Sequence, residues 1–352
     1  TMPLLLGLFS RPAAIGLGLV GMSLMPWGAL AISAHVGAKL SGVSLDVLAS
    51  WIAAVSGAVA FFLPLLCLFF ARPWSRRDAA AAIAAGAVLW LACGAATRLV
   101  GVEVAGVAGG LAVIALMALI APRRAGLAAA LRAPGLMPYL VLLGAVLVQK
   151  LAVGPLAAQG FAPALDSGRV RFAAMTSPGV ALLAATLVTA SGAVSPALVA
   201  AIAKRAWRPV AATAFFMLAA RLLVECGAIA SLAAGIGGLG RDGAVVAVAM
   251  LGAVGGFVTG SGVTGNALFM PSAADTGRSL GAVEIFAALQ NGASGHVGMA
   301  SLPVAAILLT TLGQRRDGDD AVVMRTALAL AAWHVAVVTI AALVLLRLEL
   351  QL

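Results

Sequence analysis

Three short stretches of glycine, hydroxyl and amide residues interrupt otherwise apolar segments of the chain. They cover residues 21–28, 259–266 and 290–298. Their hydroxyl and amide groups can donate hydrogen bonds to a carboxylate without placing a charge in apolar surroundings. A helix that begins at such a break also presents unpaired N–H groups, which favour an anion. These residue types therefore suggest a binding site for a small anion.

The candidate ligands in these stretches are polar or aromatic, or are glycines that allow an unwound backbone. They are Ser23, Trp27, Gly28, Thr259, Ser261, Thr264, Asn266, Asn291, Ser294 and His296. The alternative for any one break is that its small residues only let neighbouring helices approach closely. For Trp27 the alternative is an interfacial or packing role. Three breaks in one chain favour the binding interpretation.

Two charged residues lie inside an apolar segment, where charge is costly unless it is paired or hydrated. Arg221 and Glu225 are four residues apart, so they share one helix face. One hypothesis is an internal ion pair that locks helices together. The other is that Arg221 attracts the anion and Glu225 takes part in proton coupling. His296 has parallel alternatives, a hydrogen-bonding packing residue or a proton relay, and His35 and His334 are weaker relay candidates near span ends.

The composition shows which elements must position these residues. Of 352 residues, 63% are hydrophobic and 10% are charged, whereas soluble domains contain about 25% charged residues. The mean hydropathy is +1.11. The apolar runs are long and continuous rather than alternating, which predicts helices of about 20 residues that cross a bilayer. Unpaired backbone groups find no partner in lipid, so the fold class is an all-α polytopic membrane protein.

The predicted spans follow from the apolar runs and the polar joints between them. They are 10–38, 46–71, 78–98, 103–121, 137–153, 177–201, 209–235, 243–276, 280–312 and 322–347. The first, the eighth and the ninth contain the three breaks. No cofactor, no metal site and no catalytic residue is predicted, because the sequence has neither a Walker A motif nor a metal-ligand cluster nor a convincing Ser/His/Asp arrangement.

The basic residues behind the net charge of +10 cluster in alternate joints between spans. This pattern indicates how the chain is oriented in the membrane rather than nucleic-acid binding. If 243–276 crosses the membrane, Arg315 and Arg316 fall on the opposite side from the other basic clusters. If it is a re-entrant hairpin, they fall on the same side, so the hairpin is preferred. The expected location is the bacterial inner (cytoplasmic) membrane, with many passes.

The two broken stretches 10–38 and 280–312 resemble each other. An offset of 270 residues places Gly28 on Gly298, and the two stretches are expected to cross in opposite directions, as in an inverted repeat. Residues 1–132 are then the remainder of a first repeat, and residues 133–352 are the second. The counterpart of 259–266 would precede Thr1, so we expect an N-terminal segment or a second polypeptide to supply it.

At the second and third breaks the sequence resembles the L-lactate permease family. Residues 260–269 read Gly-Ser-Gly-Val-Thr-Gly-Asn-Ala-Leu-Phe, where the family has Gly-Ser-Asp-Thr-Ser-Ser-Asn-Ala-Leu-Phe. A later family segment, Asn-Thr-Thr-Gly-Gly-Val-Thr-Gly-Lys-Met followed by Ser-Pro, is matched in register by Asn291, Gly295, Gly298 and Pro303. Residues 27–29, Trp-Gly-Ala, resemble its earlier Phe-Gly-Ala element.

The resemblance implies an inverted-repeat secondary transporter with paired hairpins and elevator-type motion. It implies symport of lactate, glycolate or similar monocarboxylates, usually with protons. Two family charges are absent, because Gly262 replaces an Asp and Met299 replaces a Lys. The substrate and the coupling ion therefore stay open. The alternatives are a carrier or channel for another anion, such as a dicarboxylate, and an intramembrane enzyme or scaffold.

The expected partners follow from that function. They are a small carboxylate substrate, protons or Na⁺, membrane lipid, the segment or polypeptide that completes the first repeat, and a second copy of the chain in a homodimer. Nucleic acid is not among them.

Overall fold

The computed structural model confirms an all-α polytopic membrane fold. It describes residues 2–27, 29–120, 137–161, 164–166, 171–190, 194–313 and 316–349. Within these ranges, five helices are long and apolar enough to cross a membrane, and up to eight spans result if each of three bent pairs is one span. The chain divides into two compact units, residues 1–113 with 212–352, and residues 114–211.

The unit of residues 114–211 consists mainly of helices. After the end of α7 (Val102–Ile120) it contains α9 (Met137–Val148), a π-helix (Gln149–Val153), α10 (Gly154–Ala158), α11 (Pro178–Ala190) and the first part of α12 (Pro196–Glu225). Two strands that the sequence did not predict, β1 (Ala164–Asp166) and β2 (Arg171–Ala173), pair antiparallel. The Gln149 side-chain amide donates to the carbonyls of Met175, at 2.7 Å, and Ser177, at 2.8 Å.

Two predicted spans in this region have different bounds in the structure. Span 177–201 is interrupted after α11, and the predicted joint near Lys204 and Arg205 lies inside α12. Lys and Arg are good helix formers, so a basic cluster does not end a helix. The next helix, α13 (Ala228–Gly237), begins after Gly227, whose φ of 77° is in the left-handed region that glycine tolerates.

The first half of the larger unit contains α1 (Met2–Leu8), α2 (Arg11–Val20), α3 (Ile32–Ser41), α4 (Leu45–Val55), α5 (Gly57–Phe70) and α6 (Arg76–Leu99). Helix α6 begins at a capping box, in which the hydroxyl of Ser75 accepts from the Asp78 amide and the Asp78 carboxylate accepts from the Ser75 amide. Helices α3 and α4 meet at 117°, where Gly42 ends α3 with a φ of 73°.

The predicted interruption in 10–38 is confirmed between α2 and α3. Turns at 21–24 and two short 3-10 helices, Met25–Trp27 and Ala29–Ala31, separate these helices. Pro26 lacks an amide hydrogen, and its ring disfavours the preceding α-helical turn. Leu30 and Ala31, with φ of 60° and 51°, occupy the left-handed region, which costs an L-residue free energy.

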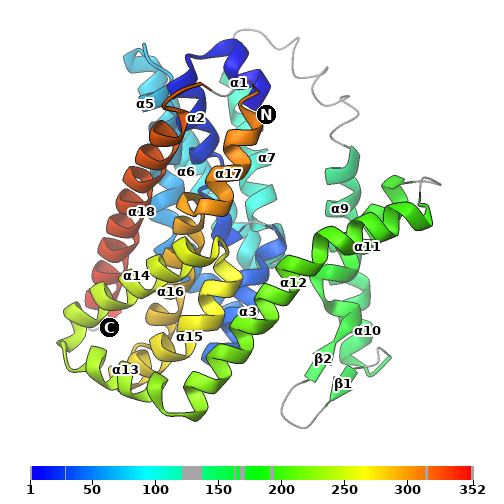
Figure 1. Cartoon of the computed structure of the whole chain (residues 1–352), viewed down its shortest axis with the longest axis vertical. Coiled ribbons are helices and arrows are strands. Elements are labelled where there is room, and N and C mark those ends of the chain that lie inside the picture. Colours follow the sequence, from blue (N-terminus) through cyan, green and yellow to red (C-terminus); the bar gives the residue numbers. More distant parts are fainter. Residues whose placement is uncertain are drawn as a thin grey trace. The chain divides into compact units, whose positions relative to one another are not determined.

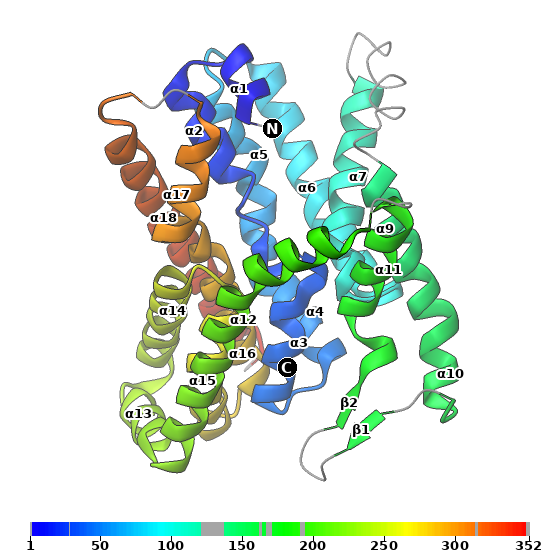
Figure 2. The same ribbon diagram turned by 45° about the vertical axis from the view of Figure 1, so that its right-hand side comes forward.

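The second half contains α14 (Gly240–Thr259), α15 (Gly262–Ser279), α16 (Val283–Val297), α17 (Leu302–Thr311) and α18 (Asp319–Glu349). Helices α14 and α15 lie side by side as a hairpin, and its tip lies within the bundle (Figures 1 and 2). The chain reverses at Gly260, whose φ is 66°, and Ser261 caps the N-terminus of α15 by accepting from the Thr264 amide. The two helices and the turn of the predicted hairpin 243–276 are therefore present. Helix α14 is also long and apolar enough to cross a membrane, so the re-entrant course stays a prediction.

The predicted broken helix 280–312 is also present, but the break lies later than the sequence suggested. Residues 290–297 remain helical in α16, and the bend of 43° separates residues 283–300 from α17. Pro303 in the first turn of α17 cannot continue the preceding helix. Ser301 caps α17 by accepting from the Val304 amide. A proline and its cap, rather than the glycines before them, therefore fix the break.

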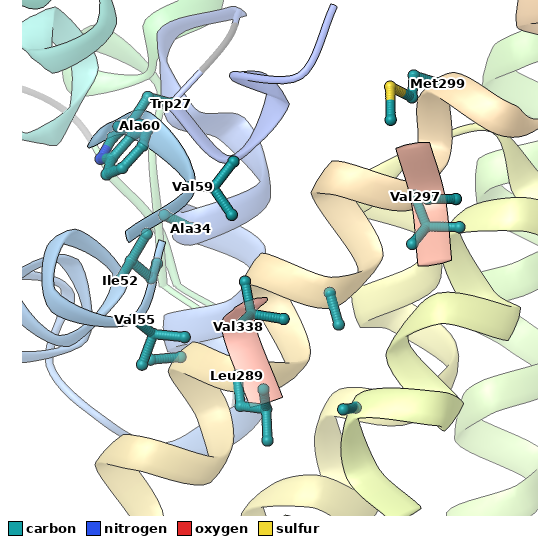
Figure 3. Packing of buried hydrophobic residues seen from close by; sticks show 14 of the residues in the cluster. Trp27, Ala34, Ile52, Val55, Val59, Ala60, Leu289, Val297, Met299 and Val338 are labelled. Atoms are coloured by element: carbon teal, nitrogen blue, oxygen red, sulfur yellow. The ribbon is translucent and has the colours of Figure 1, made fainter. Parts of the chain in front are cut away.

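The two broken stretches run in opposite directions. In both views α2 lies above α3, whereas α16 lies below α17 (Figures 1 and 2). Helix α16 is the central element of the larger unit, because every residue from 285 to 301 is buried. Leu289 lies beside Val338 of α18 and near Val55 of α4, whereas Val297 lies farther along α16, near Met299 and α18 (Figure 3).

Candidate functional site

The buried helix α16 carries four polar side chains inside the apolar core. Gln290, Asn291, Ser294 and His296 are all 0% exposed. One atom of each has no hydrogen-bond partner in the described structure, namely Gln290 Oε1, Asn291 Nδ2, Ser294 Oγ and His296 Nε2. A buried polar atom without a partner destabilises the fold by about 1–3 kcal/mol. Their accumulation on one helix therefore points to a function other than packing.

An amide pair joins the hairpin to α16. Asn266, in the first turns of α15, donates from Nδ2 to the Ser33 carbonyl, at 3.0 Å, and to Asn291 Oδ1, at 2.7 Å. Because a carbonyl only accepts, the Ser33 carbonyl fixes the orientation of both amides. Asn266 Oδ1 and Asn291 Nδ2 are then the free acceptor and the free donor. The Gln290 amide donates to the Gly265 carbonyl, at 3.4 Å, which leaves Oε1 as a second acceptor.

Glycines allow the three breaks to meet. A Cβ on Gly262 would lie 3.2 Å from the Cα of Gly295, and a Cβ on Gly295 would lie 2.9 Å from the Pro26 ring. A Cβ on Gly260 would lie 2.7 Å from Ser301 Oγ. The hairpin tip therefore contacts the third break directly, and α16 touches both the tip and the first break at Gly295.

The first break contributes Ser23 and Trp27, which are both buried. The Ser23 carbonyl accepts from His296 Nδ1, at 2.6 Å, and the Ser23 hydroxyl donates to Met299 Sδ, at 3.5 Å. Trp27 Nε1 has no partner among the described residues. Gly28, the remaining predicted ligand of this break, lies outside the described residues.

The predicted ligands at the hairpin tip serve the local backbone. Thr259 is half-buried and donates to the Gly255 carbonyl, at 2.7 Å. Ser261 is half-buried and accepts from the amide of Thr264, which is itself buried. Their substrate contacts stay a prediction. Five other predicted ligands are buried. Four of them form two hydrogen-bonded pairs that α16 connects, Asn266 with Asn291 and Ser23 with His296, and Ser294 lies on α16 between Asn291 and His296. We call these five residues and Gln290 the polar cluster.

Arg221 and Glu225 pair with each other on α12, and their side chains are 58% and 60% exposed. Arg221 lines a cleft of about 460 Å³ together with Lys39, Ala267 and Asp275. Ala267 directly follows Asn266 of the polar cluster in the sequence, so the cleft lies beside the same part of α15. The predicted coupling role of Arg221 and Glu225 stays a prediction.

Sequence reasoning missed two features of this region, Gln290 and Glu103, and placed a third, His334, near a span end although it lies in the middle of α18. Gln290 was inside a break but was not named as a ligand. Glu103, at the first turn of α7, is 6% exposed and lies 3.0 Å from His35 Nε2. His334 is fully buried on α18, with its ring centroid 5.3 Å from that of His296. For Glu103 and His334, the apolar residues around each of them were the available signal.

The polar cluster has no charged side chain, so it is suited to binding through neutral donors and acceptors. Asn291 Nδ2 and Ser294 Oγ can donate, whereas Asn266 Oδ1 and Gln290 Oε1 can accept. A ligand that fits these groups accepts hydrogen bonds at one end and donates a hydrogen bond at the other.

Comparison with known proteins identifies the family. A family model described as L-lactate permease matches residues 139–349, which include the hairpin and the third break but not the first break. No curated protein and no solved structure matched the chain. The family is one of transporters rather than enzymes, and it indicates lactate transport. Since the match covers more than half of the sequence, this chain belongs to the L-lactate permease family.

Proposed function

We propose that the protein is a secondary active transporter of small 2-hydroxy monocarboxylates such as lactate and glycolate, coupled to protons or another cation. The observation that carries the proposal is the polar cluster at the meeting point of three helix breaks. Its unpaired donors, Asn291 Nδ2 and Ser294 Oγ, suit a carboxylate. Its unpaired acceptors, Asn266 Oδ1 and Gln290 Oε1, suit a hydroxyl group on the neighbouring carbon.

The neutral character of the cluster supports cation coupling. A carboxylate that enters a buried site without a positive partner carries an uncompensated charge, which is costly in low-dielectric surroundings. A proton or Na⁺ that enters with it removes this cost. Gly262 stands where the family motif has an Asp. This position has little room for a larger side chain, since a Cβ would lie 3.2 Å from Gly295 Cα and 3.4 Å from Ser33 Cβ.

The opposite directions of the two broken stretches support an inverted repeat and alternating access around the cluster. We keep residues 1–132 and 133–352 as the proposed repeats, with a further segment or polypeptide as the proposed partner of the first. We also propose the bacterial cytoplasmic membrane as the location.

Transport assays in proteoliposomes test the function. We expect saturable uptake of labelled lactate, driven by an inward cation gradient, and counterflow when unlabelled lactate is loaded inside. Conductance without counterflow would indicate a channel. Stronger competition by dicarboxylates than by lactate or glycolate would favour the alternative substrate class.

Two buried serines provide a matched test of the site. Ser294 and Ser272 are both 0% exposed, and neither hydroxyl has a partner. Removing either hydroxyl breaks no described hydrogen bond, so both variants should fold. We expect Ser294→Ala to weaken the lactate-dependent thermal stabilisation at least tenfold in apparent affinity, because one ligand contact is lost. We expect Ser272→Ala to retain it. Equal behaviour of the two variants would place the substrate elsewhere.

A further inference from the structure

Two histidines from different helices stack in the centre of the larger unit. His296 lies on α16 and His334 on α18, and both are 0% exposed. Their ring centroids are 5.3 Å apart, with 29° between the ring planes. Trp333 contacts the His334 ring edge-on, at 4.9 Å between centroids. The pair is therefore enclosed by protein and not exposed at a surface.

The hydrogen bonds fix the neutral form of each ring. His296 Nδ1 bonds to the Ser23 carbonyl and His334 Nδ1 to the Leu330 carbonyl. Because carbonyl oxygens only accept, both Nδ1 atoms carry the hydrogen. Both Nε2 atoms are then bare lone pairs, and neither has a partner in the described structure. The pair presents two unused proton acceptors at the core of the protein.

The two rings together can hold one proton. A second positive charge about 5 Å from the first would be strongly disfavoured in buried surroundings. The ring centroids are 5.3 Å apart, and none of the ion pairs described in the structure involves either ring. The Ser23 carbonyl faces His296 from the first break, and Trp333, next to His334 on α18, contacts Phe62 of α5.

The pair adjoins the polar cluster. His296 belongs to the cluster and follows Gly295, which contacts the first break at Pro26 and the hairpin tip at Gly262. A proton on this pair would place one positive charge on α16, the helix that also carries Asn291 and Ser294 of the proposed carboxylate site. One proton and one carboxylate together are neutral, which removes the cost of burying either alone.

We propose that His296 and His334 form the binding site for the co-transported proton. An Nε2 lone pair takes one proton from the solution on the side to which the site is open, and it releases that proton with the substrate on the other side. On uptake an O–H bond of a hydronium ion breaks as the N–H bond forms, and on release the N–H bond breaks as the proton returns to water. This proposal rests on the proposed carboxylate transport and names the groups that couple it.

Two other acid–base pairs in the described chain are rivals. The His35 ring already bonds to Glu103, at 3.0 Å, and its side chain is 26% exposed. Glu225 pairs with Arg221, and both are more than half exposed. Neither pair has a contact with the polar cluster among the described interactions. His35→Gln is therefore a suitable control for His334→Gln.

The test measures proton entry and lactate exchange in the same proteoliposomes, with an internal pH indicator and labelled lactate. We expect His334→Gln to lower the ratio of proton entry to lactate exchange at least tenfold, and His35→Gln to leave this ratio as in the wild type. The proposal is overturned if this ratio is unchanged in His334→Gln, or if it falls in His35→Gln and not in His334→Gln. Lactate uptake by the wild type with Na⁺ and without proton entry overturns it too, while the proposed function stands.

Absence of uptake of any small carboxylate by the wild type would instead refute the proposed function.

A second measurement does not depend on the folding of His334→Gln. The chain has three histidines, so ¹⁵N-histidine NMR of His35→Gln in detergent reports only the stacked pair. On addition of lactate at mildly acidic pH, we expect one bare Nε2 signal to become that of a protonated nitrogen. Two bare Nε2 signals that persist at saturating lactate contradict the proposal.

Discussion

The two broken stretches of the larger unit are built differently. Between α16 and α17 the break is short, and Ser301 and Pro303 fix it in ordinary backbone conformations. Between α2 and α3 the chain passes through turns and 3-10 helices, and two residues other than glycine, Leu30 and Ala31, have positive φ. Strain of this kind persists only where the surroundings impose it. The comparison suggests that the first break is held by its contacts with α16, whereas the second break is encoded locally.

The largest expected effect comes from separating the first break from α16. The Cβ of Gly295→Ala would lie 2.9 Å from Pro26 Cγ and 3.1 Å from Pro26 N, and a proline ring cannot rotate away. We expect a loss of about 1–3 kcal/mol in stability, as for other overpacked cores, and at least a tenfold loss of lactate transport.

Gly94→Ala is the control, because a Cβ at Gly94 in α6 would meet nothing within 4 Å. Thermal unfolding in detergent and uptake in proteoliposomes compare the two variants. If Gly295→Ala is as stable and as active as Gly94→Ala, the first break is not held by this contact.

The second effect measures the strain itself. Ala31 and Ala300 are both 0% exposed, but of these two only Ala31 has a positive φ. Replacement by glycine removes one buried methyl group and adds chain entropy at both positions. At Ala31 it also relieves roughly 1–2 kcal/mol of left-handed strain. We therefore expect Ala31→Gly to be more stable than Ala300→Gly by about 1–2 kcal/mol in chemical unfolding. Equal destabilisation would mean that the first break stores no strain.

The comparison also shows what the sequence could and could not predict. Glycine, serine and proline patterns located the first two breaks and placed the third a few residues too early, and the spacing of basic joints favoured the hairpin. The third break lies after 290–298 because a glycine-rich run remains helical when it is packed on every side. The strain at Leu30 and Ala31 was invisible because neither residue type prefers it. The Asn266–Asn291 and His296–His334 pairs depend on tertiary packing, which a single sequence does not reveal.

A smaller effect distinguishes the serines of the two breaks. Ser301 accepts from the Val304 amide as the cap of α17, so Ser301→Ala should cost about 0.5–2 kcal/mol of stability with little change in lactate affinity. Ser23 donates only to the weak acceptor Met299 Sδ. We expect Ser23→Ala to change stability by less than about 0.5 kcal/mol but to weaken lactate binding several-fold, because Ser23 belongs to the polar cluster. Thermal shift with and without lactate measures both quantities, and the reverse pattern would exchange the roles assigned to the two breaks.

The smallest effect is expected outside both breaks, at the exposed ion pair on α12. Arg221 and Glu225 pair with each other, and their side chains are more than half exposed. If the stacked histidines hold the coupled proton, Glu225→Gln should retain proton-driven lactate uptake within about twofold, since the pair has no described contact with the histidines. The opposite result is that uptake no longer depends on the pH gradient in Glu225→Gln but still depends on it in His334→Gln. Proton coupling would then be assigned to α12 and not to the buried histidine pair beside the first break. The strained first break would then lack the role in coupling that its hydrogen bond to His296 suggests.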